Sequence, residues 1–106
     1  MSREMRFTFI ACSDLNEIWE SIALPPNMWG SSDPRRLSSA EEFAAGLAKH
    51  CELLTQHPEA GAERAGLPPG IRSTRFQKYV IFYRARGDVT EVIRVLPAIR
   101  DVDTAE

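Results

Sequence analysis

The chain has no hydrophobic run long enough to cross a membrane. Nowhere in its 106 residues is there a stretch approaching the roughly 20 consecutive apolar residues that a spanning helix needs. Residues 1–6 include an acidic residue and are not followed by an apolar block, so they do not resemble a secretory signal. We therefore expect a cytoplasmic protein with no membrane partner.

Residues that bind metals or act as nucleophiles are also scarce. The two cysteines, Cys12 and Cys51, share no metal-ligand spacing with each other or with His50 and His57. Free cysteines in a small cytosolic domain are most often buried and behave as small hydrophobes. Neither histidine has a carboxylate or second ligand at a supporting spacing. We therefore predict no catalytic residue, no metal site and no cofactor.

The length of the chain predicts one domain, spanning residues 1–106. A chain of this size can bury roughly 65% of the surface that its unfolded form exposes. It therefore needs no disulfide or metal to fold.

The net charge of −2 conceals an uneven distribution. Residues 1–63 contain 5 Lys or Arg and 10 Asp or Glu, whereas residues 64–100 contain 8 and 2. Such charge patterns determine association rather than fold. The basic region predicts contact with an anionic partner, either nucleic acid or an acidic protein segment. A solvated surface on which charges happen to segregate is the alternative.

The first 26 residues predict a strand followed by a helix. Residues 6–10 alternate apolar and polar until the last, as in a strand with one buried face. Ser13 or Asp14 can cap the helix, and Glu17 stands three residues after Asp14. The apolar stripe of this helix consists of Leu15, Ile18, Trp19, Ile22 and Ala23. Two consecutive prolines, Pro25 and Pro26, end it.

Residues 24–38 show no periodicity and contain many helix breakers, which predicts a loop. Loops of this length are often functional or mobile. Met28 and Trp29 within it either fold back as a lid on the core or remain exposed as a contact for a partner.

A second amphipathic helix is predicted from the capping residues Ser38 and Ser39 to near Gln56. Its buried stripe follows steps of four, four and three, through Phe43, Leu47, Cys51 and Leu54. Two such helices in succession predict a helical hairpin.

The last third of the chain predicts three strands. Residues 71–73, 78–84 and 92–96 are rich in β-branched and aromatic residues, with a turn at residues 86–88. The middle run is apolar on both faces through most of its length, which is typical of a central strand. The whole chain therefore predicts an α+β fold of order β-α-α-β-β-β, with a helical hairpin packed on a small, mainly antiparallel sheet.

Taken together and in order, these segments resemble the ParE/RelE superfamily of bacterial toxins over nearly the whole chain. The resemblance rests on residues 14–19 in the first helix, on residues 43–54 with Pro58 and Gly61, and on residues 70–73, 79–84, 94–96 and 100–101 in the sheet. None of these motifs is diagnostic alone. Their order and spacing together are fairly specific.

The superfamily contains two activities. Its ribonuclease branch cleaves messenger RNA on the ribosome with sheet-borne basic residues and commonly a C-terminal Tyr or His. This chain has Val80 where that branch often has a basic residue, and its acidic last six residues include neither Tyr nor His. The resemblance therefore favours the ParE branch, whose members inhibit DNA gyrase by protein–protein interaction. A ribosome-dependent mRNA endonuclease and a non-toxic interaction module remain the alternatives.

The resemblance also implies partners. It implies a cognate antitoxin, encoded next to the gene, that neutralises the toxin in a toxin–antitoxin hetero-oligomer. Operator DNA is then contacted only through the antitoxin.

One residue departs from the family pattern. Many ParE-like chains carry a histidine where this chain has Pro97, and a proline there ends the hydrogen bonding between strands.

Five residues are candidates for binding the target or the antitoxin. Arg94 stands among apolar neighbours, so its guanidinium must reach water, an acidic group or a partner. Arg100 occupies the position of a family arginine. The full set of candidates is Arg72, Arg75, Arg94, Arg100 and Trp29.

Overall fold

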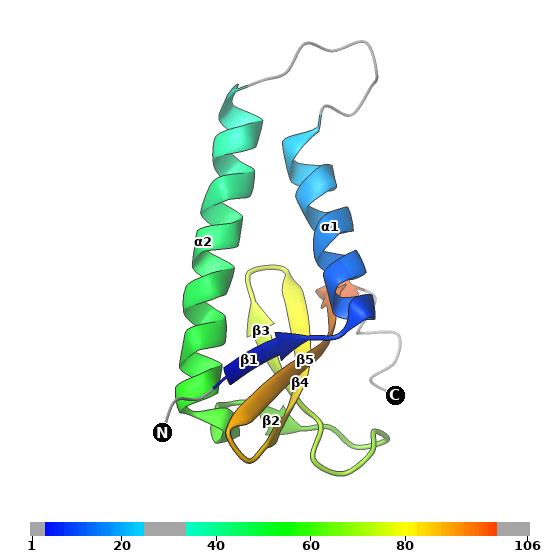
Figure 1. Cartoon of the computed structure of the whole chain (residues 1–106). Helices are drawn as coiled ribbons and strands as arrows, with labels where there is room; N and C mark the ends of the chain where they lie inside the picture. Colours follow the sequence, from blue (N-terminus) through cyan, green and yellow to red (C-terminus); the bar gives the residue numbers. More distant parts are fainter. Residues whose placement is uncertain (1–3, 25–33, 100–106) are drawn as a thin grey trace.

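Two helices cover one face of a five-stranded sheet in the computed structural model, which describes residues 4–24 and 34–99 (Figure 1). In chain order the elements are β1 (Glu4–Phe7), α1 (Phe9–Ala23), α2 (Pro34–Gln56), a 3-10 turn (Pro58–Ala60), β2 (Ala62–Glu63), β3 (Arg72–Phe76), β4 (Tyr79–Arg86) and β5 (Val89–Pro97). The strand order is β1-β5-β4-β3-β2. Only β1 runs parallel to its neighbour, β5. The predicted α+β fold is confirmed, with β4 at the centre of the sheet.

The start of α1 differs from the prediction. The strand ends at Phe7 and the helix begins at Phe9, capped by Thr8 rather than by Ser13 or Asp14. The Thr8 hydroxyl accepts a hydrogen bond from the Ala11 amide at 3.0 Å and donates one to the Ile93 carbonyl at 2.8 Å. The alternation in residues 6–10 predicted that Phe9 lies on the buried face of a strand, but Phe9 is 88% exposed in the helix.

The start of α2 also differs. The helix begins at Pro34, four residues before the predicted caps, and ends at Gln56 as predicted. Proline suits the first helical position because the amide there has no partner within the helix. The predicted loop is therefore shorter at its C-terminal end. Residues 25–33, which include Trp29, lie outside the described part of the chain.

Two features of the sheet were not predicted. The two-residue strand β2 pairs with β3. In addition, β5 carries a bulge, because the pairing with β4 shifts register between Phe82 and Tyr83. β5 ends at Pro97, as the missing amide hydrogen of proline predicts.

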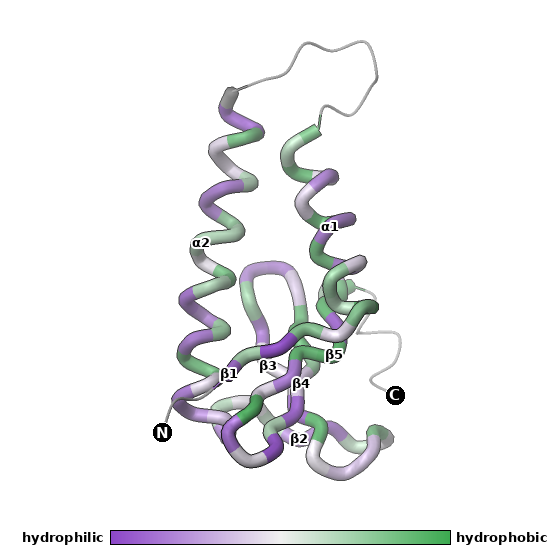
Figure 2. Tube along the Cα trace, viewed as in Figure 1, coloured by the Kyte–Doolittle hydropathy of each residue, from purple (hydrophilic) through white to green (hydrophobic). Residues whose placement is uncertain are grey.

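The core lies between the helices and the inner face of the sheet, the face that the helices cover. The predicted stripe of α2 is confirmed, since Phe43, Leu47, Cys51 and Leu54 are between 2% and 7% exposed. From the sheet, Tyr79, Ile81, Tyr83, Val92 and Val95 complete this cluster. Hydrophobic and hydrophilic residues alternate along both helices, as expected for helices with one buried stripe (Figure 2). None of the helices in residues 4–24 and 34–99 has an apolar stretch long enough to cross a membrane.

A buried hydroxyl joins β4 to the segment that follows α2. Tyr83 donates a hydrogen bond to the Pro58 carbonyl at 2.7 Å and accepts one from the Gly61 amide at 2.8 Å. A Cβ atom at Gly61 would lie 2.6 Å from the Tyr83 hydroxyl and 2.7 Å from the Ser73 carbonyl. Only glycine permits this close approach.

Candidate functional site

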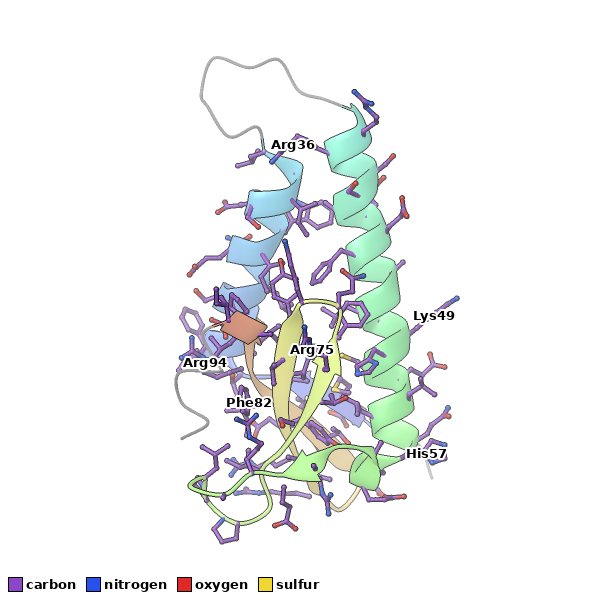
Figure 3. All side chains as sticks on the ribbon, turned by 180° about the vertical axis from the view of Figure 1, so that it is seen from behind. Arg36, Lys49, His57, Arg75, Phe82 and Arg94 are labelled. Carbon is purple, nitrogen blue, oxygen red and sulfur yellow. The ribbon has the colours of Figure 1, made fainter. Side chains whose placement is uncertain are left out.

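The outer face of the sheet, which the helices leave uncovered, is rich in arginine. Side chains alternate between the two faces along β4, so Val80, Phe82, Arg84 and Arg86 lie opposite the buried Tyr79, Ile81 and Tyr83. Paired residues of neighbouring strands share a face, which adds Arg75 of β3, Arg94 of β5 and Arg6 of β1. Three of these residues, Arg75, Phe82 and Arg94, are labelled in Figure 3.

One further arginine joins this face from the segment before β3. The Arg64 guanidinium lies 5.4 Å from the centroid of the Phe82 ring, and its Nη1 donates to the Ser73 hydroxyl at 3.3 Å. We call the resulting surface the arginine face; it consists of Arg6, Arg64, Arg75, Arg84, Arg86 and Arg94. Within the described strands, the register places two acids on this face, Glu4 and Glu91. The surface is therefore strongly cationic.

Two of these arginines pair with the acids of the same face. Arg84 Nε lies 2.9 Å from Glu91 Oε1, and Arg6 Nε lies 2.8 Å from Glu4 Oε2. The hydrogen bond to Glu4 raises the pKa of Arg6. Exposed pairs of this kind contribute little to stability, so their main effect is to orient the side chains.

Arg94 has a structural partner as well. Its Nε and Nη2 donate to the two carboxylate oxygens of Asp14 at 3.1 and 2.9 Å, and the Val95 amide donates to Asp14 Oδ2 at 3.0 Å. The hydrogen bond to Asp14 raises the pKa of Arg94. Asp14, which is 9% exposed, is therefore a buried partner of β5 and not a helix cap. The sequence left water, an acidic group or a partner as alternatives for the Arg94 guanidinium, and the structure shows the acidic group, the Asp14 carboxylate.

The structure brings together only some of the five predicted site residues. Arg75 and Arg94 lie on the arginine face, on the two strands that flank β4. Arg72 lies in the row of the buried Tyr83, where its Nη1 donates to the Gly61 carbonyl at 2.6 Å and its Nη2 lies 3.7 Å from Glu63. Arg100 and Trp29 lie outside the described residues.

The sequence reasoning missed Arg6, Arg64, Arg84 and Arg86. A signal for two of them was present, because Phe82, Arg84 and Arg86 recur with the period of two that places residues on one face of a strand. No comparable signal marked Arg64, whose place depends on a stacking contact with Phe82.

The tyrosine and histidine side chains, which could transfer a proton, lie on the helix side of the sheet. Tyr79 and Tyr83 are buried there, and His57 borders the space between the helices. His50 Nε2 lies 3.2 Å from the Thr74 hydroxyl, and burial lowers the pKa of this histidine. In the part of the chain that the structure describes, no cluster of His, Cys, Asp and Glu could hold a metal ion.

An apolar groove of about 1010 Å³ opens between α1, α2 and β1. Its lining consists of Met5, Phe7, Leu15, Trp19, Phe43, Ala44, Leu47, Ala48, Cys51, Glu52, Thr55, Gln56 and His57. The only Asp, Glu, Lys or Arg among them is Glu52. Trp19, predicted as core, therefore borders this groove. Such a large apolar opening is a typical docking surface for another protein.

The edge of the sheet next to this groove has free backbone groups. Glu4 donates its amide hydrogen to Asp88 at 2.8 Å and Thr8 donates to Val92 at 3.0 Å. Even-numbered residues of β1 therefore bond to β5, so the amide and carbonyl groups of Met5 and Phe7 point to the outer edge. A partner segment could add a strand there.

The comparisons with known proteins agree on one family. Residues 6–102 match the family described as the ParE toxin of the type II toxin-antitoxin system parDE. The chain is 31% identical over 86 residues to Toxin ParE1 of Caulobacter vibrioides, covering 81% of this chain and 79% of the relative.

Solved structures show the same fold. The chromosomal ParDE toxin-antitoxin system from P. aeruginosa matches with a TM-score of 0.67 and 18% identity, over 90% of this chain and 95% of that one. The toxin-antitoxin complex RelBE2 from Mycobacterium tuberculosis matches with a TM-score of 0.52 and 25% identity, over 92% and 99% of the two chains.

Proposed function

The chain belongs to the ParE toxin family of type II toxin-antitoxin systems, and from this membership we propose that it arrests bacterial growth by inhibiting DNA gyrase. We also propose that a cognate antitoxin neutralises it by binding in the apolar groove. Inhibition occurs by binding and requires no chemical step on the toxin.

The chemistry of the arginine face carries this proposal. A ribonuclease needs a group that removes a proton from the ribose 2′-hydroxyl and a group that protonates the leaving oxygen. Both tyrosines and both histidines of the chain lie on the helix side of the sheet, and Val80 stands on the outer face. Within residues 4–24 and 34–99, the outer face therefore supplies cations for binding but no His or Tyr for proton transfer.

The groove supports the second part of the proposal. Its lining is largely apolar, and apolar surface of this extent is costly to leave in water. The two solved relatives are named as toxin-antitoxin systems, and antitoxins often insert an apolar segment into such a groove. The occupant we propose is an amphipathic segment of the antitoxin, in a toxin–antitoxin hetero-oligomer that reaches operator DNA only through the antitoxin.

Expression of the chain in bacteria tests the first part. We expect growth arrest when it is expressed alone, and recovery when the adjacent small reading frame is co-expressed. Purified toxin should inhibit supercoiling by gyrase and leave ribosome-bound message intact. Codon-specific cuts in message with unaffected supercoiling would assign the chain to the ribonuclease alternative. Normal colony counts with confirmed soluble protein would favour the non-toxic module.

A pair of matched alanines tests the groove. Ala48 lines the groove and is exposed, whereas Ala45 is exposed on the same helix and does not line it. We expect Ala48→Arg to remain toxic but to lose rescue by the antitoxin, because a long cation enters the apolar site. Ala45→Arg should be rescued like the natural chain. Equal rescue of both variants would place the antitoxin elsewhere.

A further inference from the structure

The arginine face has features that a surface built to meet a protein does not need. Four of its arginines are each held through Nε: Arg6 by Glu4, Arg75 by the Gln77 carbonyl, Arg84 by Glu91 and Arg94 by Asp14. Nε is the guanidinium nitrogen nearest to the backbone. A contact there fixes the plane of the group and leaves terminal nitrogens further out, where they can donate to an incoming anion. Arg94 has fewer such donors than the other three, because its Nη2 also donates to Asp14.

The register places the apolar residues Val80, Phe82, Val89 and Leu96 on this face, and none of them is exposed. Protein interfaces depend on apolar anchors that fill pockets. No arginine of this face lines the large groove on the helix side or the smaller cavity of about 180 Å³ between α1, the start of β4 and the end of β5. Phe82, the aromatic residue of the face, lies under the Arg64 guanidinium. The face therefore offers fixed cations in place of anchors.

The contact between Arg64 and the Phe82 ring favours one kind of nucleic acid over another. Single strands are bound by stacking their bases on exposed aromatic side chains. Here Arg64 covers Phe82, and Tyr79 and Tyr83 face the helices. Among nucleic acids, this leaves the phosphates of a duplex as partners for the cations, and duplex DNA presents one negative charge for roughly every 1.7 Å of its axis.

We propose that the arginine face contacts the phosphate backbone of duplex DNA while the toxin acts on gyrase. This inference rests on the proposed function, since gyrase holds a DNA duplex during its reaction. The toxin then recognises the enzyme together with its DNA. The contact carries no sequence information, because phosphate contacts position a protein without reading bases.

Binding of a fluorescently labelled duplex by the purified, folded toxin tests the proposal directly, with fluorescence anisotropy as the measurement. We expect affinity to fall about 40-fold between about 50 and about 200 mM salt if three phosphates are neutralised. Absence of binding at low salt would overturn the proposal. So would tighter binding to single-stranded RNA of the same length.

Three single substitutions locate the contact. Arg75 and Arg86 are exposed on the arginine face, and within residues 4–24 and 34–99 neither forms an ion pair with a carboxylate that a substitution would break. Arg75→Gln and Arg86→Gln should each lower the slope of log affinity against log salt by about 0.9. Lys49→Gln removes a charge from an exposed position of α2, away from this face (Figure 3), and should leave the slope unchanged. Equal slopes for all three variants would contradict the proposed contact.

A supercoiling assay on the same proteins separates this inference from the proposed function. Inhibition of gyrase by a toxin that does not bind the duplex would remove the DNA contact and retain the gyrase inhibitor. Duplex binding without inhibition of gyrase would retain the DNA contact and remove the gyrase inhibitor. If both hold, Arg75→Gln should weaken inhibition and duplex binding together, and Lys49→Gln should weaken neither.

Discussion

The two faces of the sheet are built from the same strands but have opposite chemistry. On the inner face, Tyr79, Ile81 and Tyr83 are at most 5% exposed and pack against the helices. On the outer face, the alternate positions of the same strand include Arg84 and Arg86. The comparison shows how an alternation of period two separates the residues that stabilise the fold from those that are available to a partner.

Alanine substitutions at two adjacent positions of β4 should show the largest difference between the two faces. Ile81 is fully buried on the inner face, so Ile81→Ala should lower the free energy of unfolding by about 3 kcal/mol. Phe82→Ala, one residue away on the outer face, should cost about 1 kcal/mol, because only part of the ring and the Arg64 contact are lost. Urea denaturation measures both. Similar losses would mean that the outer face also contributes to the core.

Arg94 belongs to the outer face but also stabilises the fold, through its contact with Asp14. Arg94→Ala should cost about 2 kcal/mol, because it removes two of the three hydrogen bonds described for the buried Asp14 carboxylate and leaves the one from the Val95 amide. This is less than for a fully buried pair, since the Arg94 side chain is 43% exposed.

Arg75 provides the control for Arg94 on the same face. Arg75→Ala should change stability by less than about 0.5 kcal/mol, as for other surface substitutions. Thermal unfolding of both variants tests the pair. A loss of toxicity in Arg94→Ala is therefore evidence about the target only if the protein is still folded, whereas Arg75→Ala reports on the surface directly.

A smaller effect is expected from pH on the helix side of the sheet. Burial lowers the pKa of His50 from its usual 6.5, so the folded protein holds this proton less tightly than the unfolded chain. The contribution of neutral His50 is fully present above pH 6.5 and should be lost as the pH falls through its lowered pKa. His50→Gln should make stability less dependent on pH in this range, measured by urea denaturation at pH 7 and below. Unchanged pH dependence would exclude His50 as the source.

The smallest expected effect is a difference in reactivity between the two thiols of the folded protein. Burial raises the pKa of Cys51 to about 11, whereas Cys12 is exposed on α1. Because the thiolate is the reactive form, iodoacetamide at mildly alkaline pH should label Cys12 and spare Cys51 in the folded protein. Mass spectrometry should show one added group before denaturation and two after it. Two groups on the native protein would indicate that the core opens readily.

The sequence predicted the structure correctly where apolar residues recur with a regular period. The α2 stripe from Phe43 to Leu54, the end of that helix and the central position of β4 were all predicted correctly. The start of α1 was wrong because its determinants are distant. Thr8 and Asp14 bond to residues more than 75 positions later in the chain, so no local pattern could show that one is the cap and the other a buried partner.

The candidate site was predicted only in part for the same reason. The sequence indicated that the basic half would meet an anionic partner and singled out Arg75 and Arg94, which the register then places on one face. It could not show that Arg72 bonds to the Gly61 carbonyl, because that contact depends on how the segment after α2 returns to β3. Nor could it predict the groove, whose walls come from three elements.

The position of β1 has a consequence for how the protein is synthesised. β1 pairs with β5 alone, and the first turns of α1 bond to β5 through Thr8 and Asp14. The N-terminal segment therefore has no strand partner until the C-terminal strand has left the ribosome. Contacts this distant in sequence also make folding slow. Translation of the chain is thus nearly complete before the arginine face and the groove exist.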